Sequence, residues 1–292
     1  MLWAFATLGI SPSASLLAAL SFVADKSAGS FNPQDVANTL WAMAVLQIEP
    51  PSSLARHTSK IGTALNDKEL EQISYAHLVG QALGWSMQLP NELVQRAQSV
   101  QRRLAQQPTV SRLQQRVYDA RGMGQRPELE ALTDDGLFSI DIALPESEQE
   151  SRPKIAVEVD GPSHFTSSGS KTGNTQLRDF LLEQRGWRVV SLPYFAINAA
   201  SNDAELTEYL ADALLHKPRR SFPTMRLRLP SALMPCPAST PSSPRSPLPS
   251  TAPDFAPPIA PTAPTQAQQR PLDARAREFI PGGAASRSKQ RW

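Results

Sequence analysis

Three carboxylates fall where neighbouring strands would bring them together. Glu158 and Asp160 end the segment 154–160, whose apolar and polar residues alternate as in a β-strand. Because side chains of a strand alternate between its two faces, Glu158 and Asp160 should share one face, roughly 6–7 Å apart. Asp141 belongs to the preceding strand-like segment, 137–144, and is expected to face them.

Such a cluster could support metal-dependent chemistry. Carboxylates held together without a cation repel one another, which raises the pKa of at least one of them. A Mg²⁺ ion would relieve the repulsion, and hydrolysis of a phosphodiester uses carboxylates that hold Mg²⁺. Asp141, Glu158 and Asp160 are therefore candidate catalytic residues. The alternative is structural: Asp160 shapes the turn that follows it, and Glu158 pairs with Arg188 of a neighbouring strand.

Four cationic side chains after these carboxylates are candidates for RNA binding: His164, Lys171, Arg178 and Arg185. His164 lies in a loop, where it could contact a phosphate or act as an acid, or could simply hydrogen-bond Asp160. Lys171 lies on the same loop and could supply positive charge beside the carboxylates, or remain solvated. The two arginines lie on the next helix, where they could meet backbone phosphates or form a solvated face.

The segment 109–217 has the pattern of a small α/β domain with the order αβββαβα. A hairpin signal, Thr133 to Gly136, joins the first two strands, and Gly186 ends the second helix. The expected strands are 129–132, 137–144, 154–160 and 187–192, and the expected helices are 111–122, a helix starting at Asn174 or Thr175, and 202–216.

Several motifs in this segment resemble the RAP domain, in the order that this family shows. They are Glu158–Phe165, Thr172–Thr175, Leu177–Leu182 and Gly186–Phe195, and the resemblance covers about residues 152–212. It implies a small restriction-endonuclease-like fold and a role on RNA in a mitochondrion or chloroplast, in transcript stability, splicing, ribosomal RNA maturation or translation.

The resemblance also implies roles for the carboxylates. Asp141 and Glu158 match the positions that hold metal in enzymes of the restriction-endonuclease-like fold. Asp160, however, stands where such enzymes are expected to have a lysine. This departure implies weak Mg²⁺-dependent cleavage at most, and it favours RNA binding, which requires no cofactor.

A repeat with an offset of 38 residues occupies the N-terminal part of the chain. Leu2–Ile10 aligns with Leu40–Ile48, and a weaker third copy surrounds Leu78. Periods of this length indicate stacked helical units, in which Trp3 and Trp41 are expected to pack between helices. The repeat resembles octotricopeptide repeats and those of FAST kinase-like proteins. Because the chain opens inside a repeat, we expect an incomplete helical segment and a fragment of a longer protein.

Composition separates the end of the chain from the rest. Residues 218–292 hold 16 of the 27 prolines and a net charge of +8, whereas residues 1–217 carry −6. This predicts a disordered tail, whose positive charge could add salt-dependent RNA affinity. The predicted division is a helical-repeat segment at 1–108, a RAP-type α/β domain at 109–217 and the disordered tail at 218–292.

Other classes of protein are excluded by what the sequence lacks. The single cysteine, Cys236, cannot form an internal disulfide, and no Cys/His cluster suggests a zinc site. No apolar run reaches the ~18–20 residues of a membrane span. No basic residue precedes Lys26, so the start does not match an Arg-rich transit peptide.

These observations favour an RNA-binding factor in organellar RNA processing, stability or translation, with single-stranded RNA as its partner. One alternative is a metal-dependent endoribonuclease. Another is a protein–protein adaptor in an RNA-processing complex, which the acidic balance of residues 109–217 favours, with 11 basic and 17 acidic residues.

Overall fold

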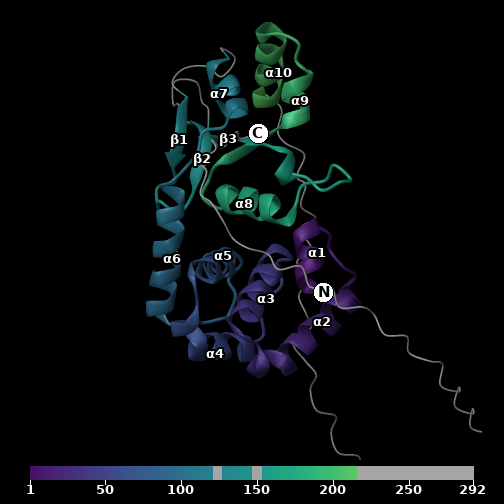
Figure 1. The fold of residues 1–292 in the computed structure, drawn as a ribbon, viewed down its shortest axis with the longest axis vertical. Coiled ribbons are helices and arrows are strands. Elements are labelled where there is room, and N and C mark those ends of the chain that lie inside the picture. The colour runs from purple at the N-terminus through teal and green to yellow at the C-terminus, as the bar shows by residue number, and fades with distance from the viewer. Residues whose placement is uncertain (121–126, 147–152, 216–292) are drawn as a thin grey trace, which may run out of the picture. The chain divides into compact units, whose positions relative to one another are not determined.

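The computed structural model describes residues 1–120, 127–146 and 153–215, which belong to one compact unit, Met1–Arg226. N-terminal helices are followed by a small region of strands and helices (Figure 1). This layout confirms the predicted helical segment and α/β segment. The predicted tail, 218–292, lies outside the described residues. In the described part of the chain, no helix is long and apolar enough to cross a membrane.

The first 105 residues form three successive pairs of α-helices. The pairs are α1 (Leu2–Leu8) with α2 (Ala14–Ser27), α3 (Pro33–Val45) with α4 (Ser52–Ile61), and α5 (Asp67–Leu83) with α6 (Asn91–Ala105). The first helices of the pairs pack on one another, α1 on α3 and α3 on α5 (Figure 1). Stacked helical pairs are what the sequence repeat predicts, and the prediction is confirmed.

The start of each later pair is set by local sequence. The Asn32 side chain accepts a hydrogen bond from the Asp35 N–H at 2.9 Å, and the Asp35 carboxylate accepts one from the Asn32 N–H at 3.2 Å. Asn66 and Glu69 repeat this reciprocal cap at the start of α5, with distances of 3.1 and 2.8 Å. Each such cap satisfies two backbone donors that a helix would otherwise leave unpaired.

The two tryptophans of the repeat differ in their surroundings. Trp41 is 7% exposed in α3, which packs against both α1 and α5, so the expected core role is confirmed. Trp3 is 51% exposed, and the same expectation is wrong for it. The reason is its place in the stack: among the described helices, α1 has a neighbouring first helix on only one side.

The α/β region contains one four-stranded sheet. Its strands are β1 (Glu128–Leu132), β2 (Ser139–Leu144), β3 (Ile155–Asp160) and β4 (Arg188–Pro193), and its helices are α7 (Arg112–Asp119), α8 (Gly173–Glu183), α9 (Tyr194–Ala199) and α10 (Asp203–Leu215). The strand order is β1-β2-β3-β4; β3 and β4 are parallel and the other pairs antiparallel. The predicted order αβββαβα is confirmed, with α9 as an additional short helix.

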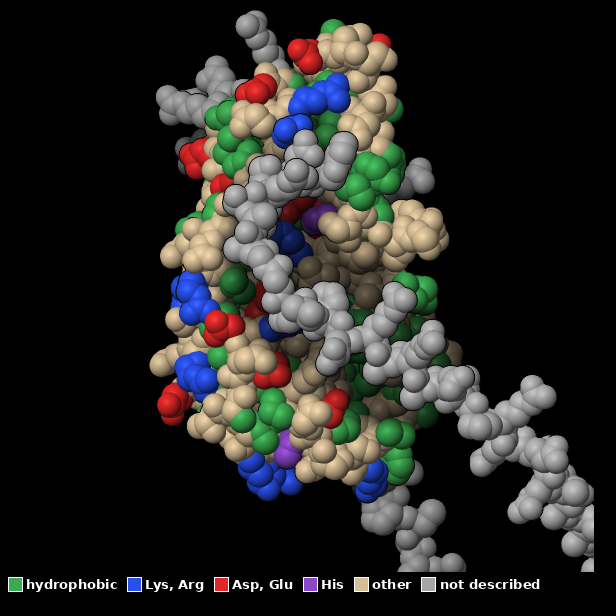
Figure 2. All heavy atoms as spheres, viewed as in Figure 1, with side chains coloured by type: hydrophobic (Ala, Val, Ile, Leu, Met, Phe, Trp, Pro, Cys, Tyr) green, Lys and Arg blue, Asp and Glu red, His purple; other side chains and the backbone are tan. Residues whose placement is uncertain are grey.

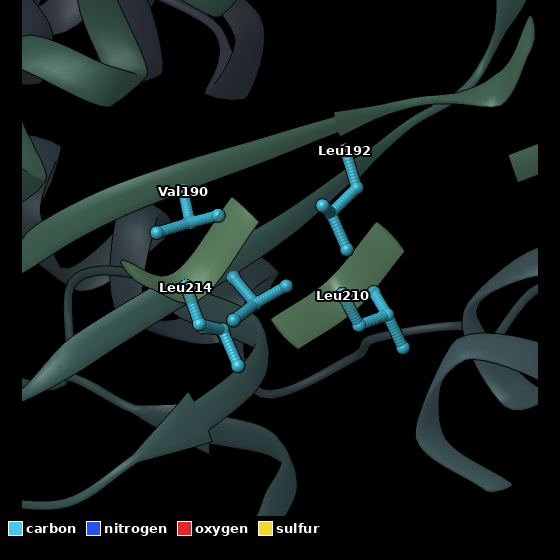
Figure 3. A pocket seen from close by; sticks show the side chains of 5 residues that line it. Val190, Leu192, Leu210 and Leu214 are labelled. Carbon is cyan, nitrogen blue, oxygen red and sulfur yellow. The ribbon is translucent and has the colours of Figure 1, made fainter. Parts of the chain in front are cut away.

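Both faces of this sheet are covered. Ile155, Val157 and Val159 of β3 belong to a core shared with α7, α9 and α10, whereas Ala156 belongs to a core shared with α8 and the repeat helices. Figure 3 shows Val190 and Leu192 of β4 facing side chains of α10, with no room for a water molecule between them. This contact is core packing and offers no ligand site.

Helix α8 joins the sheet to the helical repeats. It contacts α1, α3 and α5 in addition to β4. Gly173, its first residue, lies so close to α1 that a Cβ atom there would be 1.7 Å from the Ala6 carbonyl oxygen. One face of α8 therefore packs on the repeats, and the residues at the end of β3 are placed against the other.

Candidate functional site

The site is built around the carboxyl end of β3, beneath α8. Glu158 and Asp160 are 3% and 1% exposed, and both contact side chains from α8 or from the loop that leads into it. The predicted placement of these two carboxylates on one face is therefore confirmed. Their burial has a strong consequence, because an ionised carboxylate away from water requires a nearby cation and hydrogen-bond donors.

Glu158 pairs with Arg178 of α8. The Arg178 Nε–H donates to Glu158 Oε2 at 2.7 Å, and Nη2 donates to Oε1 at 3.4 Å and to the Ser139 carbonyl oxygen. Burial opposes the charge of Arg178, but the Glu158 carboxylate outweighs it and raises the pKa of the guanidinium. The pair is thus an ion pair under a helix, with the guanidinium bridging β2 and β3.

The prediction that Glu158 pairs with Arg188 is wrong. The register of β3 and β4 places Arg188 opposite Ile155 and places Ser191 opposite Glu158. Three residues along a strand separate Arg188 from Glu158, which is roughly 10 Å. Arg188 instead donates from Nη2 to the carbonyl oxygen of Leu214 in α10.

Asp160 lies among three donors. Its Oδ1 is 3.0 Å from His164 Nδ1, its Oδ2 is 3.1 Å from Lys171 Nζ, and Ser191 Oγ donates to Oδ2. Burial opposes ionisation of Asp160, but the His164 hydrogen bond and the Lys171 charge outweigh it, and the pKa of Asp160 is lowered. On the face shown in Figure 2, a histidine lies in a recess beside acidic and basic side chains.

His164 therefore makes the predicted hydrogen bond with Asp160. This bond raises the pKa of His164, although burial acts in the opposite direction. The backbone of His164 is fixed in the loop, because the Thr172 N–H donates to the His164 carbonyl oxygen at 2.8 Å, and the Thr175 hydroxyl lies 3.3 Å from Nδ1 of the ring. The His164 side chain is still 38% exposed, so one side of the ring faces solvent.

Lys171 is not a solvated lysine. Its Nζ contacts Asp179 Oδ2 at 2.5 Å as well as Asp160, and its side chain is 17% exposed. Burial disfavours its charge, but Asp179 and Asp160 outweigh burial and raise the pKa of Lys171. Lys171 therefore supplies positive charge beside Asp160 at the end of β3.

Asp179 is a member of the site that the sequence did not point to. Burial raises the pKa of Asp179 to about 6, against the opposing charge of Lys171. Among the described residues, its Oδ1 has no hydrogen-bond partner. The sequence could have indicated Asp179, because Thr175, Arg178 and Asp179 follow the i, i+3, i+4 spacing of one helix face.

Asp141 contacts β3 through the backbone. Its Oδ2 accepts a hydrogen bond from the Val159 N–H at 2.7 Å. Burial raises the pKa of Asp141 to about 7, and the negative charge of Glu158 adds to the effect, so this carboxyl holds a proton up to near-neutral pH. The expectation that crowding raises one carboxyl pKa is confirmed, with burial as the larger cause.

These carboxylates do not fit a divalent cation. Arg178 donates to both Glu158 oxygens, and His164 and Lys171 contact the two Asp160 oxygens. A metal ion at either carboxylate would lie beside a guanidinium or an ammonium group, and like charges at such distances repel strongly. Within the described residues, no three His, Cys, Asp or Glu side chains are arranged to hold a metal ion.

The expectation of a solvated face for Arg178 and Arg185 is also wrong. Arg185 donates to Asp135 Oδ2 at 2.8 Å and to the Leu181 carbonyl oxygen at 2.9 Å. Its guanidinium also lies over the Phe138 ring, 4.7 Å from the centroid. Arg178, within α8, and Arg185, just after it, thus fasten this helix to the hairpin of β1 and β2.

A comparison with known families identifies this region. Residues 157–213 match the family model of the RAP domain, a range that runs from β3 into α10 and includes Glu158, Asp160, His164 and Lys171. RAP domains are generally associated with RNA binding. The match agrees with the range of about 152–212 expected from the sequence motifs, so the chain contains a segment that matches the RAP domain.

Proposed function

We propose that this protein binds single-stranded RNA through its folded part and acts as a non-catalytic factor in organellar RNA processing, stability or translation. The observation that carries the proposal is the RAP domain match, which contains most of the candidate site. The stacked helical repeats support it, because solenoids present extended surfaces to long ligands. The proposed compartment is a mitochondrion or chloroplast, by resemblance to octotricopeptide and FAST kinase-like proteins.

The ion pairs of the site favour binding over cleavage. Cleavage of a phosphodiester by this type of fold needs carboxylate oxygens that are free to hold Mg²⁺. Here the charges of Glu158 and Asp160 are already balanced by Arg178, Lys171 and His164. The same contacts hold α8 and its preceding loop on the sheet, which is a structural role.

The folded part should bind RNA without the tail. A chain ending at residue 217 should bind a fluorescent single-stranded RNA with a Kd within roughly tenfold of that of the full chain at moderate salt. The full chain should show a steeper dependence on salt, because its basic residues after 217 add phosphate contacts. Fluorescence anisotropy over a series of salt concentrations measures both quantities.

Binding that disappears with residues 218–292 would show that the tail alone carries the affinity. A chain that fails to bind any RNA yet assembles stably with RNA-processing proteins would support the adaptor alternative. The net charge of −6 over residues 109–217 favours this alternative, because RNA-binding surfaces are usually basic.

Purified protein should cleave RNA slowly or not at all in Mg²⁺ or Mn²⁺. The carboxylates are already paired, and Asp160 stands where a lysine is expected from the resemblance. Loss of the electrostatic contact that such a lysine would make typically lowers the rate by ~10²–10³. Any residual cleavage should be the same for the double variant Glu158→Gln with Arg178→Met, which removes both charges of the buried pair. Gel analysis of end-labelled RNA measures it; rapid cleavage that this folded double variant abolishes would instead establish the endoribonuclease.

A further inference from the structure

Three aromatic side chains gather beside the ion-pair cluster without taking part in it. The ring centroids of Phe165 and Phe195 are 5.5 Å apart, those of Tyr194 and Phe195 are 5.5 Å apart, and those of Phe165 and Tyr194 are 6.1 Å apart. The ring planes are tilted or perpendicular to one another, an arrangement that aromatic pairs prefer. We refer to Phe165, Tyr194 and Phe195 as the aromatic triad.

The triad is positioned by the two parallel strands of the sheet. Phe165 follows β3 by five residues, and Tyr194 and Phe195 directly follow Pro193, the last residue of β4. Because β3 and β4 are parallel, their carboxyl ends meet at the same edge of the sheet. The loops that follow the two strands therefore bring their side chains together at that edge.

The loop that carries Phe165 is itself well defined. Phe165 forms an antiparallel bridge with Lys171, and the Thr166 N–H donates to the Ser170 carbonyl oxygen at 2.8 Å. Gly169, with φ of +81°, supports the turn between them. The ring of Phe165 therefore stands on a short hairpin that Lys171 ties to Asp160 and Asp179.

The triad presents one ring to solvent. Phe195 is 51% exposed, whereas Phe165 and Tyr194, which both contact its ring, are partly buried. Helix α9 is anchored by Ile197, which is fully buried, so packing of this helix does not depend on Phe195. A single exposed aromatic residue is ordinary, but one held by two further rings is preorganised for a flat partner.

The surroundings of the triad favour a nucleotide as that partner. His164 precedes Phe165, and among the described residues its Nε2 makes no hydrogen bond, so this nitrogen can meet a phosphate or a base. The hydroxyls of Thr166 and Ser168 lie on the same loop, 2.9 Å apart. Aromatic rings flanked by an imidazole and hydroxyl groups match the base, phosphate and 2′-hydroxyl of single-stranded RNA.

We propose that Phe165, Tyr194 and Phe195 form a stacking platform for a base of single-stranded RNA, with the neighbouring loop facing its phosphate and sugar. This inference rests on the proposed RNA-binding function and identifies where one nucleotide is held. Stacking accepts any base, because every base has a flat face. The platform therefore contributes affinity for single strands without sequence preference.

The test uses the full chain and three variants. Phe195→Ala should weaken binding of single-stranded RNA by ~10-fold, since one base–aromatic stack is lost. Phe195→Trp should retain the affinity, because it keeps a flat ring. Leu132→Ala is the control, since Leu132 is 41% exposed in β1, at the opposite edge of the sheet from β4, and its loss should leave affinity within a factor of about 2.

Two further measurements separate stacking from simple loss of apolar surface. RNA carrying 2-aminopurine should show fluorescence quenching on binding to wild-type protein, and less quenching with Phe195→Ala. An abasic oligonucleotide of the same charge should bind wild-type protein and Phe195→Ala equally.

Wild-type protein that binds RNA, together with Phe195→Ala that binds equally well and quenches equally, would overturn the platform and leave the proposed function standing. Wild-type protein that binds no RNA would overturn both. Loss of a protein partner in Phe195→Ala, with RNA affinity unchanged, would also overturn the platform by making this surface a protein interface.

Discussion

Replacing Arg178 with methionine should lower the free energy of unfolding by about 3–5 kcal/mol, the typical cost of leaving a buried charge without its partner. Glu158 is 3% exposed, and Arg178 is the residue of α8 that neutralises it. The methionine keeps much of the side-chain volume, so the effect reports the unpaired carboxylate and not a cavity. Urea denaturation followed by tryptophan fluorescence measures the change.

Two variants serve as controls for Arg178→Met. The double variant Arg178→Met with Glu158→Gln should recover most of the lost stability, because it removes the charge that was left unpaired. Arg185→Met should cost less, about 1–2 kcal/mol, since its partner Asp135 is 36% exposed and such pairs contribute little, while its contact with the Phe138 ring is also lost. If Arg178→Met costs no more than Arg185→Met, the ion pair does not hold α8 on the sheet.

Replacing Asp141 with asparagine should instead raise the free energy of unfolding. The pKa of Asp141 is raised from 3.8 to about 7 in the folded protein, so this carboxyl is protonated more readily when folded than when unfolded. Below pH 3.8, Asp141 therefore does not lower the free energy of unfolding. As the pH rises from 3.8 to about 7, ionisation of Asp141 lowers this free energy increasingly, and above about pH 7 the loss stays constant. Asparagine removes this loss and can still accept the hydrogen bond from the Val159 N–H.

The expected gain for Asp141→Asn is roughly 2 kcal/mol at pH 8, falling toward zero at pH 4. This figure is smaller than the full pKa change implies, because Asp141 is partly exposed to solvent. Asp134→Asn is the matched control: its side chain is 90% exposed, so stability should change by less than ~0.5 kcal/mol at either pH. A loss of stability in Asp141→Asn at pH 8 would contradict a raised pKa.

The strand pattern is the part of the site that sequence predicted well. Alternation along β3 correctly placed Glu158 and Asp160 on one face, because a period of two leaves no other arrangement once Val157 and Val159 are buried. The turn at 133–136 was predicted equally well, because it depends only on residues that are neighbours in the chain. Gly136 takes a φ of +67°, and the Thr133 N–H donates to the Phe138 carbonyl oxygen at 2.9 Å.

The partners of the carboxylates were harder to predict, because they depend on register and loop path. The sequence suggested Arg188 as the partner of Glu158, and only the pairing of Ile155 with Arg188 in the sheet excludes it. Lys171 reaches Asp160 because the loop after β3 folds back as a hairpin. Neither feature follows from the spacing of residues along the chain.

The most direct test of RNA binding by the RAP domain is ultraviolet crosslinking of the intact protein to RNA, followed by mapping of the crosslinked peptides. We expect crosslinks within residues 157–213, at the peptides that contain Phe165 and Tyr194–Phe195, where the rings would contact bases. Crosslinks confined to residues 218–292, or none at all under conditions in which RNA is bound, would contradict the account.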